Sequence, residues 1–226
     1  MTEGSLPLTT EPFWAAGLKR GFDILGAAFG LVMLSPLLIA LGIAVRLSSP
    51  GPALFRQRRV GRYGKPFLLL KFRSMTVRGG TEAGSFEPGD RSRITRVGRI
   101  LRATKLDELP QLWNVLRGDM SLVGPRPEVP RWVEAYPERW ARVLAVRPGI
   151  TDWAAILYRD EERLLADAAD PEALYRDQIL PRKLDRYEEY VRSWSLAGDC
   201  AILLKTVGAV VGRFGVARST QGTREP

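Results

Sequence analysis

The chain has 226 residues, and its 45% hydrophobic content is enough to bury one good core. It has no histidine and a single cysteine, which excludes Ser-His-Asp and Cys-His catalysis, a histidine general base, the usual zinc sites and an internal disulfide. The net charge of +9 and the pI near 10.1 indicate an anionic partner, namely nucleic acid, an anionic membrane or a phosphorylated substrate. Carboxylates remain the candidates for a nucleophile or general base.

The most apolar stretch of the chain lies near its N-terminus. Residues 1–18 form a mixed tail to which we assign no chemistry, and an uncharged run of 22 residues extends from Ile24 to Val45. At about 1.5 Å per residue, this run is long enough to cross a bilayer core of about 30 Å. It exceeds the apolar part of a signal peptide and leads directly into a basic segment. We therefore expect residues 19–47 to form a membrane segment that remains in the mature protein.

Two arrangements of this segment are open: a straight span, or a re-entrant hairpin that breaks at Ser35 and Pro36. Positive residues flank both ends, with Lys19 and Arg20 before the run and basic residues between 46 and 59 after it, and such residues favour the cytoplasmic side. A helix that breaks at Pro36 and turns back places both ends there, and the Ser35 hydroxyl can donate to a carbonyl left unpaired. Charge and proline favour re-entry only slightly, since spanning helices also tolerate proline.

Residues 48–195 are expected to form a cytoplasmic catalytic domain. Two short strands, at 53–55 and 67–72, are predicted to join through glycines. From Ile24 to Thr81 the chain contains nine cations and no acids. These basic side chains either line a surface near lipid headgroups or form a solvated positive rim.

A polar loop at 81–90 and a basic amphipathic helix at 91–104 lead to the central motif of the chain, residues 105–127. Asp107 and Glu108 are the chemical centre of this motif. A helix is predicted directly after them, because a proline suits its first turn and a glycine can end it. The commonest explanation for acids at such a position is that they complement the helix dipole.

Cations around the acid pair favour a chemical role instead. Arg102 and Lys105 precede the acids, Arg117 and Arg126 follow them, and Arg126 lies in a rigid Gly-Pro-Arg-Pro loop. An arginine fork matches phosphate oxygens in two hydrogen bonds. Of two adjacent carboxylates, one can attack phosphorus while the other holds a Mg²⁺ that neutralises the phosphates. The motif therefore indicates phosphoryl transfer.

The remaining chain carries weaker signals. A helix is expected at 134–145, and the rigid turn at 147–151 either presents Arg147 to a phosphate or base or is a plain structural turn. Residues 161–190 are predicted to form surface helices broken at Pro171 and Pro181, with no site. Residues 196–226 are expected to form an interfacial or core helix and a tail. The predicted fold class is α+β and mostly helical, with short strands and interfacial amphipathic helices.

Six motifs together resemble the bacterial sugar transferases, which are small monotopic polyprenyl-phosphate phosphoglycosyl transferases. They are KRGFD at 19–23, Ser35-Pro36, SPGPALFRQRRVG at 49–61, KFRSM at 71–75, LDELPQLWNVLRGDMSLVGPRP at 106–127 and RPGIT at 147–151. The number, length and order of these motifs make coincidence very improbable.

The resemblance implies a monotopic enzyme of the bacterial inner membrane, with a re-entrant helix broken at Ser35-Pro36 and its catalytic domain on the cytoplasmic face. Such an enzyme moves a sugar 1-phosphate from a UDP-sugar to undecaprenyl phosphate and releases UMP, by a ping-pong mechanism, in the first membrane step of bacterial glycan assembly. Its partners would be these two substrates and membrane phospholipids, with no nucleic acid. A homodimer, or contacts with later glycosyltransferases, would also fit.

The resemblance also implies roles for individual residues. Asp107 would be the nucleophile that forms a phosphosugar-aspartyl intermediate, and Glu108 would help to bind Mg²⁺. Arg102 and Arg126 would bind substrate phosphate, with Lys71 close to the same site. Arg147 would be a weaker candidate for binding the nucleotide end of the substrate. The sequence departs from the family pattern in the segment 152–195, where Asp-Trp-Ala stands in place of Gly-Trp-Ala and leads into a longer helical insert, so the sugar is not predicted.

Two other readings compete with this enzyme. Composition alone fits a membrane-anchored protein that binds anionic lipid or nucleic acid, although a nucleic-acid binder more typically interleaves basic and aromatic residues on an exposed face. A scaffold of a glycan-assembly complex that has lost catalysis is the third reading. The presence of Asp107, Glu108 and Arg126 argues against it.

Overall fold

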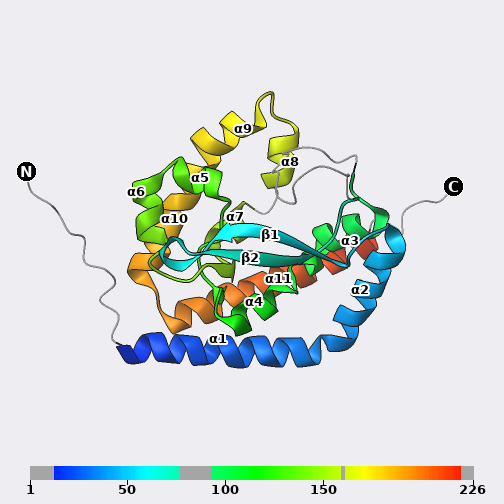
Figure 1. The fold of residues 1–226 in the computed structure, drawn as a ribbon, viewed down its shortest axis with the longest axis horizontal. Coiled ribbons are helices and arrows are strands. Elements are labelled where there is room, and N and C mark those ends of the chain that lie inside the picture. Colours follow the sequence, from blue (N-terminus) through cyan, green and yellow to red (C-terminus); the bar gives the residue numbers. More distant parts are fainter. Residues whose placement is uncertain (1–12, 77–92, 159–160, 220–226) are drawn as a thin grey trace, which may run out of the picture.

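The computed structural model describes residues 13–76, 93–158 and 161–219. Within these residues the protein is mostly helical, with two small two-stranded sheets, which confirms the predicted α+β class. The first helix lies along one edge of the molecule, the second turns away from its end, and the other elements gather on one side of the first helix (Figure 1). The predicted loop at 81–90 lies outside the described residues.

The apolar run forms two helices, α1 (Phe13–Met33) and α2 (Ser35–Ser48), which are bent by 64°. Pro36 lies in the first turn of α2 and has no N–H to give to the Val32 carbonyl one turn earlier. The Ser35 hydroxyl donates to that carbonyl instead, at 2.8 Å. Helix α1 begins within the tail predicted for residues 1–18, which is therefore helical from Phe13 onward.

In the described part of the chain, no single helix is both long and apolar enough to cross a membrane, but the bent pair passes that test of length and composition as a unit. Large apolar side chains of both helices are exposed, among them Leu25, Phe29, Val32, Met33, Ile39, Ile43 and Leu47. Exposed apolar surface of this extent is typical of contact with a membrane or another apolar partner.

An antiparallel hairpin follows the helix pair, formed by β1 (Leu54–Val60) and β2 (Pro66–Phe72). The first strand is longer than the predicted 53–55, and within it the exposed Arg56 and Arg58 lie on either side of the buried Gln57, as the period of a strand requires. The turn η1 (Arg62–Gly64) closes the hairpin.

Helix α3 (Arg96–Thr104) begins later than the predicted position 91, at the N-cap Thr95, whose hydroxyl accepts a hydrogen bond from the Gly98 amide at 2.9 Å. The turn η2 (Leu106–Glu108) then leads into α4 (Gln111–Arg117), which ends at Gly118 in a left-handed conformation, as predicted.

The buried side chain of Asn114 joins α4 to the hairpin. Its amide nitrogen donates to the Leu68 carbonyl at 2.8 Å, and its oxygen accepts from the Leu70 amide at 3.0 Å. These bonds fix β2 beside α4, and with it the lysine at position 71.

Two short strands, β3 (Ser121–Val123) and β4 (Gly149–Thr151), pair in parallel. Between them lie α5 (Pro130–Glu134) and α6 (Pro137–Val143), so the helix predicted at 134–145 starts at Pro137 and is preceded by a separate short helix. The backbone after β3 touches β4 directly: a Cβ on Gly149 would lie 2.1 Å from the Gly124 nitrogen. This contact sets the position of the loop at 124–127.

Beyond β4 the chain forms α7 (Trp153–Leu157), α8 (Glu161–Ala166), α9 (Pro171–Leu174), the π-helical turn η3 (Tyr175–Ile179) and α10 (Leu180–Ser193). The prediction that residues 161–190 are surface helices is wrong for one face. Tyr175, Leu180, Leu184 and Tyr187 are buried in a core cluster. Most charged side chains of α10 are exposed on the other face, although Lys183 is buried. In the sequence these charges obscure a stripe of apolar residues at helical spacing.

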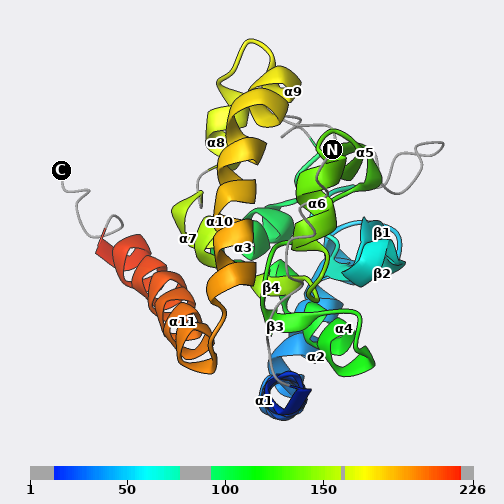
Figure 2. The ribbon, with the colours of Figure 1, turned by 90° about the vertical axis from the view of Figure 1, so that its left-hand side faces the viewer.

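The last helix, α11 (Leu196–Ser219), extends away from α10, and Figure 2 shows α1 end-on below it. Lys19 of α1 joins these distant parts, because its ammonium lies 2.6 Å from Asp199 of α11 and 3.3 Å from Asp23. Asp23 in turn accepts hydrogen bonds from the Ser121 hydroxyl and the Leu122 amide of β3. The KRGFD motif thus connects the first helix with the strand that leads to the 124–127 loop.

Candidate active site

The acid pair lies in the sharp turn η2 between α3 and α4. Lys105 ends α3 in a left-handed conformation, with φ of 60°, and this reverses the chain just before Asp107. Asp107 and Glu108 are 7% and 8% exposed. Acids that only complement a helix dipole normally stay in water, so burial of both carboxylates calls for specific partners.

Glu108 has those partners. Its carboxylate accepts a hydrogen bond from Lys71 of β2 at 3.0 Å and from both terminal nitrogens of Arg126, with Nη1 at 3.2 Å from Oε2. Burial by itself would raise the pKa of Glu108, but the charges of Arg126 and Lys71 outweigh it and hold that pKa well below its ordinary value. Glu108 is therefore ionised and fixed between two cations.

Asp107 is in the opposite situation. Its Oδ1 atom is buried and has no hydrogen-bond partner within the described residues. Burial raises the pKa of Asp107, Lys71 opposes that rise, and the neighbouring Glu108 charge adds to it. Adjacent carboxylates whose pKa values are pushed apart in this way are typical of acid pairs with divided chemical roles.

The loop that carries Arg126 is held by a second buried pair. Arg59 of β1 donates to the Pro127 carbonyl at 3.1 Å and to the Glu128 carboxylate at 3.1 Å. Glu128 also accepts a hydrogen bond from the Tyr175 hydroxyl. Sequence reasoning missed these positioning residues, because Arg59 looked like one of many arginines in the basic block and Glu128 follows the motif without any pattern of its own.

The structure brings four of the predicted site residues together, namely Asp107, Glu108, Lys71 and Arg126. Arg102 lies on the last turn of α3, where its backbone carbonyl accepts from the Lys105 amide just before the acid pair.

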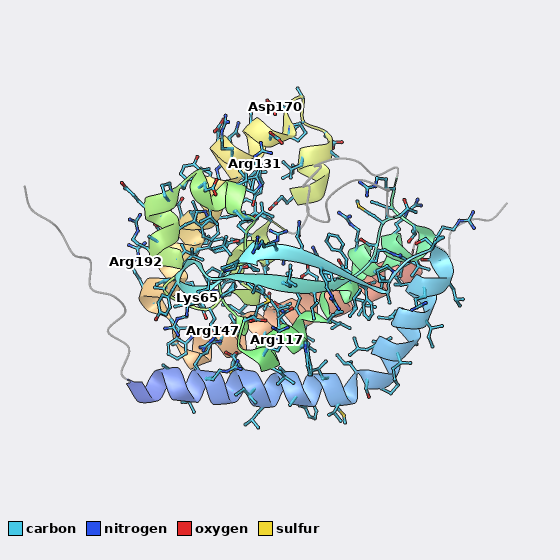
Figure 3. The ribbon with its side chains drawn as sticks, viewed as in Figure 1. Lys65, Arg117, Arg131, Arg147, Asp170 and Arg192 are labelled. Atoms are coloured by element: carbon cyan, nitrogen blue, oxygen red, sulfur yellow. The ribbon has the colours of Figure 1, made fainter. Side chains whose placement is uncertain are left out.

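Arg147 lies elsewhere. Its Nε donates at 3.0 Å to the Gly118 carbonyl at the C-terminal end of α4, whereas the acids precede the N-terminal end of that helix. Figure 3 labels it at the level of α4, near α1. Arg20 binds two more carbonyls of the same helix end, so both arginines complement the negative end of the α4 dipole. Substrate binding by Arg147 stays a prediction that this geometry does not favour.

A cavity of about 310 Å³ adjoins the pair of Glu108 and Arg126. Asp107 is not among its lining residues, although it is the neighbour of Glu108 in the turn. Much of the wall is apolar and comes from η2, α4, β4, α7 and α11. Its other charged members include Lys183 of α10 and Glu161 of α8, in the segment for which the sequence predicted no site.

The acid pair alone does not form a complete metal site, so a magnesium ion here would need substrate phosphates among its ligands. No group of three or more acidic, histidine or cysteine side chains is placed to hold a metal in the described ranges. Mg²⁺ commonly binds to one or two carboxylates together with substrate phosphates. The Glu108 carboxylate has about four acceptor positions, and its bonds to Lys71 and Arg126 use three. One acceptor position of Glu108 and the unpartnered Asp107 oxygen therefore remain available to an ion within the described residues.

Comparison with known protein families identifies the chain. The model of the family described as bacterial sugar transferase matches residues 14–213. A Caulobacter vibrioides UDP-glucose:undecaprenyl-phosphate glucose-1-phosphate transferase is 44% identical over 85% of this chain and 69% of its own length. The Escherichia coli protein of the same name is 41% identical over 84% of this chain and 39% of its own length.

A third relative carries a different sugar in its name. The UDP-N-acetylgalactosamine-undecaprenyl-phosphate N-acetylgalactosaminephosphotransferase of Aeromonas hydrophila is 36% identical over 92% of this chain and 47% of its own length. The chain thus spans less than half of the Aeromonas and Escherichia proteins. Because the names differ in the sugar, similarity alone does not select one.

Proposed function

The chain belongs to the bacterial sugar transferase family, and we propose that it transfers a sugar 1-phosphate from a UDP-sugar to undecaprenyl phosphate and releases UMP. The named activities of its relatives support the reaction. One observation carries the proposal. Asp107 has a buried oxygen without a hydrogen-bond partner within the described residues, and its neighbour Glu108 is held by Arg126 and Lys71. Such a site offers a nucleophile beside two phosphate-binding cations.

In the proposed first step, a carboxylate oxygen of Asp107 attacks the phosphorus that bears the sugar. The new P–O bond creates a mixed anhydride between the Asp107 carboxyl group and the sugar phosphate, and the bond that breaks is the one from that phosphorus to the bridging oxygen, which leaves with UMP. In the second step, a phosphate oxygen of undecaprenyl phosphate attacks the same phosphorus. The Asp107 carboxylate leaves, and the lipid pyrophosphate sugar is formed. This is a ping-pong sequence, since UMP departs before the lipid reacts.

Arg126 and Lys71 make this attack feasible. An anionic Asp107 has to approach a doubly charged pyrophosphate, and preorganised cations in a site that excludes water offset the repulsion and stabilise the transition state. The Arg126 fork that now binds Glu108 matches phosphate oxygens equally well. Arg102, one turn before the acids, is proposed as a further phosphate contact.

Glu108 is proposed to hold Mg²⁺ through its remaining acceptor position, together with substrate phosphates. When bound, the ion would neutralise pyrophosphate charge and stabilise the leaving UMP. Glu108 has a second task that needs no metal, because its carboxylate keeps the Arg126 and Lys71 side chains in place before substrate arrives.

The bent pair of α1 and α2 is proposed to enter the cytoplasmic leaflet and return at Ser35 and Pro36. Its 64° bend and its exposed apolar side chains support re-entry. Lys19 and Arg20 of α1 precede the apolar run of the pair and Arg46 of α2 follows it, and cations at both ends favour the cytoplasmic side. The enzyme would then reside on the cytoplasmic face of the bacterial inner membrane, in contact with phospholipids and its lipid substrate.

The test is release of UMP by the purified protein in detergent, with a UDP-sugar, undecaprenyl phosphate and Mg²⁺. We expect UMP to appear with at least one UDP-sugar and to require the metal. Absence of UMP with every UDP-sugar, combined with retention on anionic vesicles, would instead support a membrane-anchored binding protein. The Asp107→Asn variant serves as the catalytic control, since it removes the nucleophile and preserves its size.

A further inference from the structure

The cavity beside the acid pair extends from the catalytic turn to the segment formed by α8 and α10. Glu108 and Arg126 belong to its lining from one part of the fold, and Lys183 and Glu161 from the other. Its volume of about 310 Å³ lies at the lower end of the range for ligand pockets. It fits one ring-sized group next to the phosphates better than a complete nucleotide sugar.

Lys183 and Glu161 form an ion pair at this cavity. The Lys183 ammonium lies 3.0 Å from a Glu161 oxygen, and the two side chains are 5% and 21% exposed. The ammonium also lies 3.4 Å from the Tyr175 hydroxyl. These described contacts use two of its three N–H groups, so one donor is available to a ligand in the cavity.

Lys183 also faces the buried carboxyl groups of Glu128 and Asp152 and acts to lower the pKa of each, but that structural role does not require the additional carboxylate of Glu161. Burial of an ion pair costs desolvation free energy, and a hydrophobic pair of similar size is often as stable. Much of the surrounding cavity wall is apolar, with Leu109 and Ile156 among its members. A lysine next to a carboxylate in such a wall presents one donor and one acceptor side by side, which is the pattern that two neighbouring hydroxyls of a sugar ring require.

We propose that this cavity binds the sugar ring of the UDP-sugar, with Lys183 donating to one ring substituent and Glu161 accepting from another. Apolar residues such as Leu109 and Ile156 contact the C–H face of the ring. The proposal rests on the proposed transferase function and adds the residues that select the sugar.

The test compares kcat/KM for UMP release from UDP-glucose, UDP-galactose, UDP-N-acetylglucosamine and UDP-N-acetylgalactosamine. The variants are Glu161→Gln, which keeps the shape of the side chain, and Lys183→Met, which keeps most of its length. Loss of the Lys183 hydrogen bond predicts a fall of roughly tenfold to a hundredfold for the preferred UDP-sugar. Glu161→Gln predicts a smaller fall, roughly fivefold, because its amide oxygen still accepts a hydrogen bond but carries no charge. The fall should be smaller for a UDP-sugar that differs at the contacted ring substituent. The ratio of kcat/KM between the preferred UDP-sugar and that one should therefore decrease.

Glu172→Gln is the matched control. Glu172 pairs with Arg131 in an exposed ion pair of the same segment, and Figure 3 shows Arg131 at the end of the molecule away from α1. This variant should leave all four kcat/KM values within about twofold, because exposed ion pairs contribute little. The KM for undecaprenyl phosphate should also stay within about twofold in Glu161→Gln, since that side chain is proposed to contact only the sugar.

Two results would overturn the proposal while the transferase function stands. One is an equal fall for all four donors in Glu161→Gln, and the other is a change confined to the KM for undecaprenyl phosphate, which would assign the cavity to the lipid. If Lys183→Met does not fold, Glu161→Gln decides the question alone. A parent protein that releases no UMP from any donor would overturn both this proposal and the proposed function.

Discussion

Arg126 binds Glu108 with both terminal nitrogens of its guanidinium group, and the Nη1 to Oε2 distance is 3.2 Å. A fork of this kind fits a phosphate as well as a carboxylate. Glu108 therefore holds Arg126 in a geometry in which it can receive a phosphate, and the loop at 124–127 is rigid enough to keep it there. The predictions below concern this arrangement and the parts of the fold that support it.

Replacement of Arg126 by alanine should lower the rate of UMP release roughly 10²-fold to 10³-fold, by analogy with the loss of one preorganised donor. Arg126→Lys is the control, because lysine keeps the charge but not the fork and should retain part of the activity. Steady-state kinetics with purified variants measures both. An Arg126→Ala rate within about threefold of the parent would contradict the assigned role.

The acid limb of the pH profile should depend on Lys71. Burial raises the pKa of Asp107, and the Lys71 charge opposes that rise. Since Asp107 has to be ionised to attack, Lys71→Met should raise its pKa further and move the acid limb of kcat/KM to higher pH. Lys71→Arg keeps the charge and should leave the limb near that of the parent. An unchanged limb in Lys71→Met would mean that Asp107 is not the titrating group.

The Gly124–Gly149 contact should be essential for positioning Arg126. A Cβ at Gly149 would lie 2.1 Å from the backbone nitrogen of Gly124, two residues before Arg126, so Gly149→Ala has to displace the loop. We expect at least a roughly tenfold loss of activity, as small displacements of catalytic groups are costly.

Gly208→Ala on α11 is the matched control for that prediction, because a Cβ there has nothing within 4 Å. It should leave the rate unchanged and slightly stabilise the helix. Equal activity of the Gly149→Ala and Gly208→Ala variants would contradict the proposed role of the contact.

Asp152→Asn should stabilise the protein at neutral pH. Asp152 caps α7 through the Ala155 amide at 2.8 Å, while its other oxygen is buried without a hydrogen-bond partner in the described residues. Burial raises its pKa from 3.8 to about 6. Because the folded pKa exceeds the unfolded one, folding favours the protonated acid, and this stabilisation is lost as pH rises through about 6. Asparagine keeps the cap and carries no charge.

The gain should be on the order of 1–3 kcal/mol at about pH 7.5 and should shrink steadily between about pH 6 and pH 4. Thermal unfolding of both proteins across this pH range measures it. A gain that does not change with pH, or a loss at neutral pH, would contradict the assignment.

The central motif was the part of the site that sequence could predict. Asp107, Glu108 and Arg126 lie within one motif, and turn-forming residues around them mark where the helix starts and ends. Lys71 was assigned through resemblance alone, since the bonds from Asn114 that place β2 beside α4 leave no sequence signal. The position of the loop that carries Arg126 likewise depends on the contact between Gly124 and Gly149, which are far apart in the sequence.

The segment at 161–190 shows why the rest could not be predicted. Its charges suggested solvated helices, but Tyr175, Leu184 and Tyr187 form part of a core, and Lys183 and Glu161 reach the cavity. The two residues of this ion pair are 22 positions apart, and the tertiary fold brings Glu161 of α8 within 3.0 Å of Lys183 of α10. A local pattern cannot distinguish such a pair from two surface charges.

The most direct test of the proposed mechanism is intact-protein mass spectrometry of the purified protein with Mg²⁺ and a panel of UDP-sugars, without lipid acceptor. We predict a mass gain equal to one phosphosugar in the parent and none in Asp107→Asn, and the size of the gain would identify the sugar. Absence of any adduct in a protein that still releases UMP once undecaprenyl phosphate is added would contradict the covalent mechanism. That result would establish direct transfer between the two substrates instead.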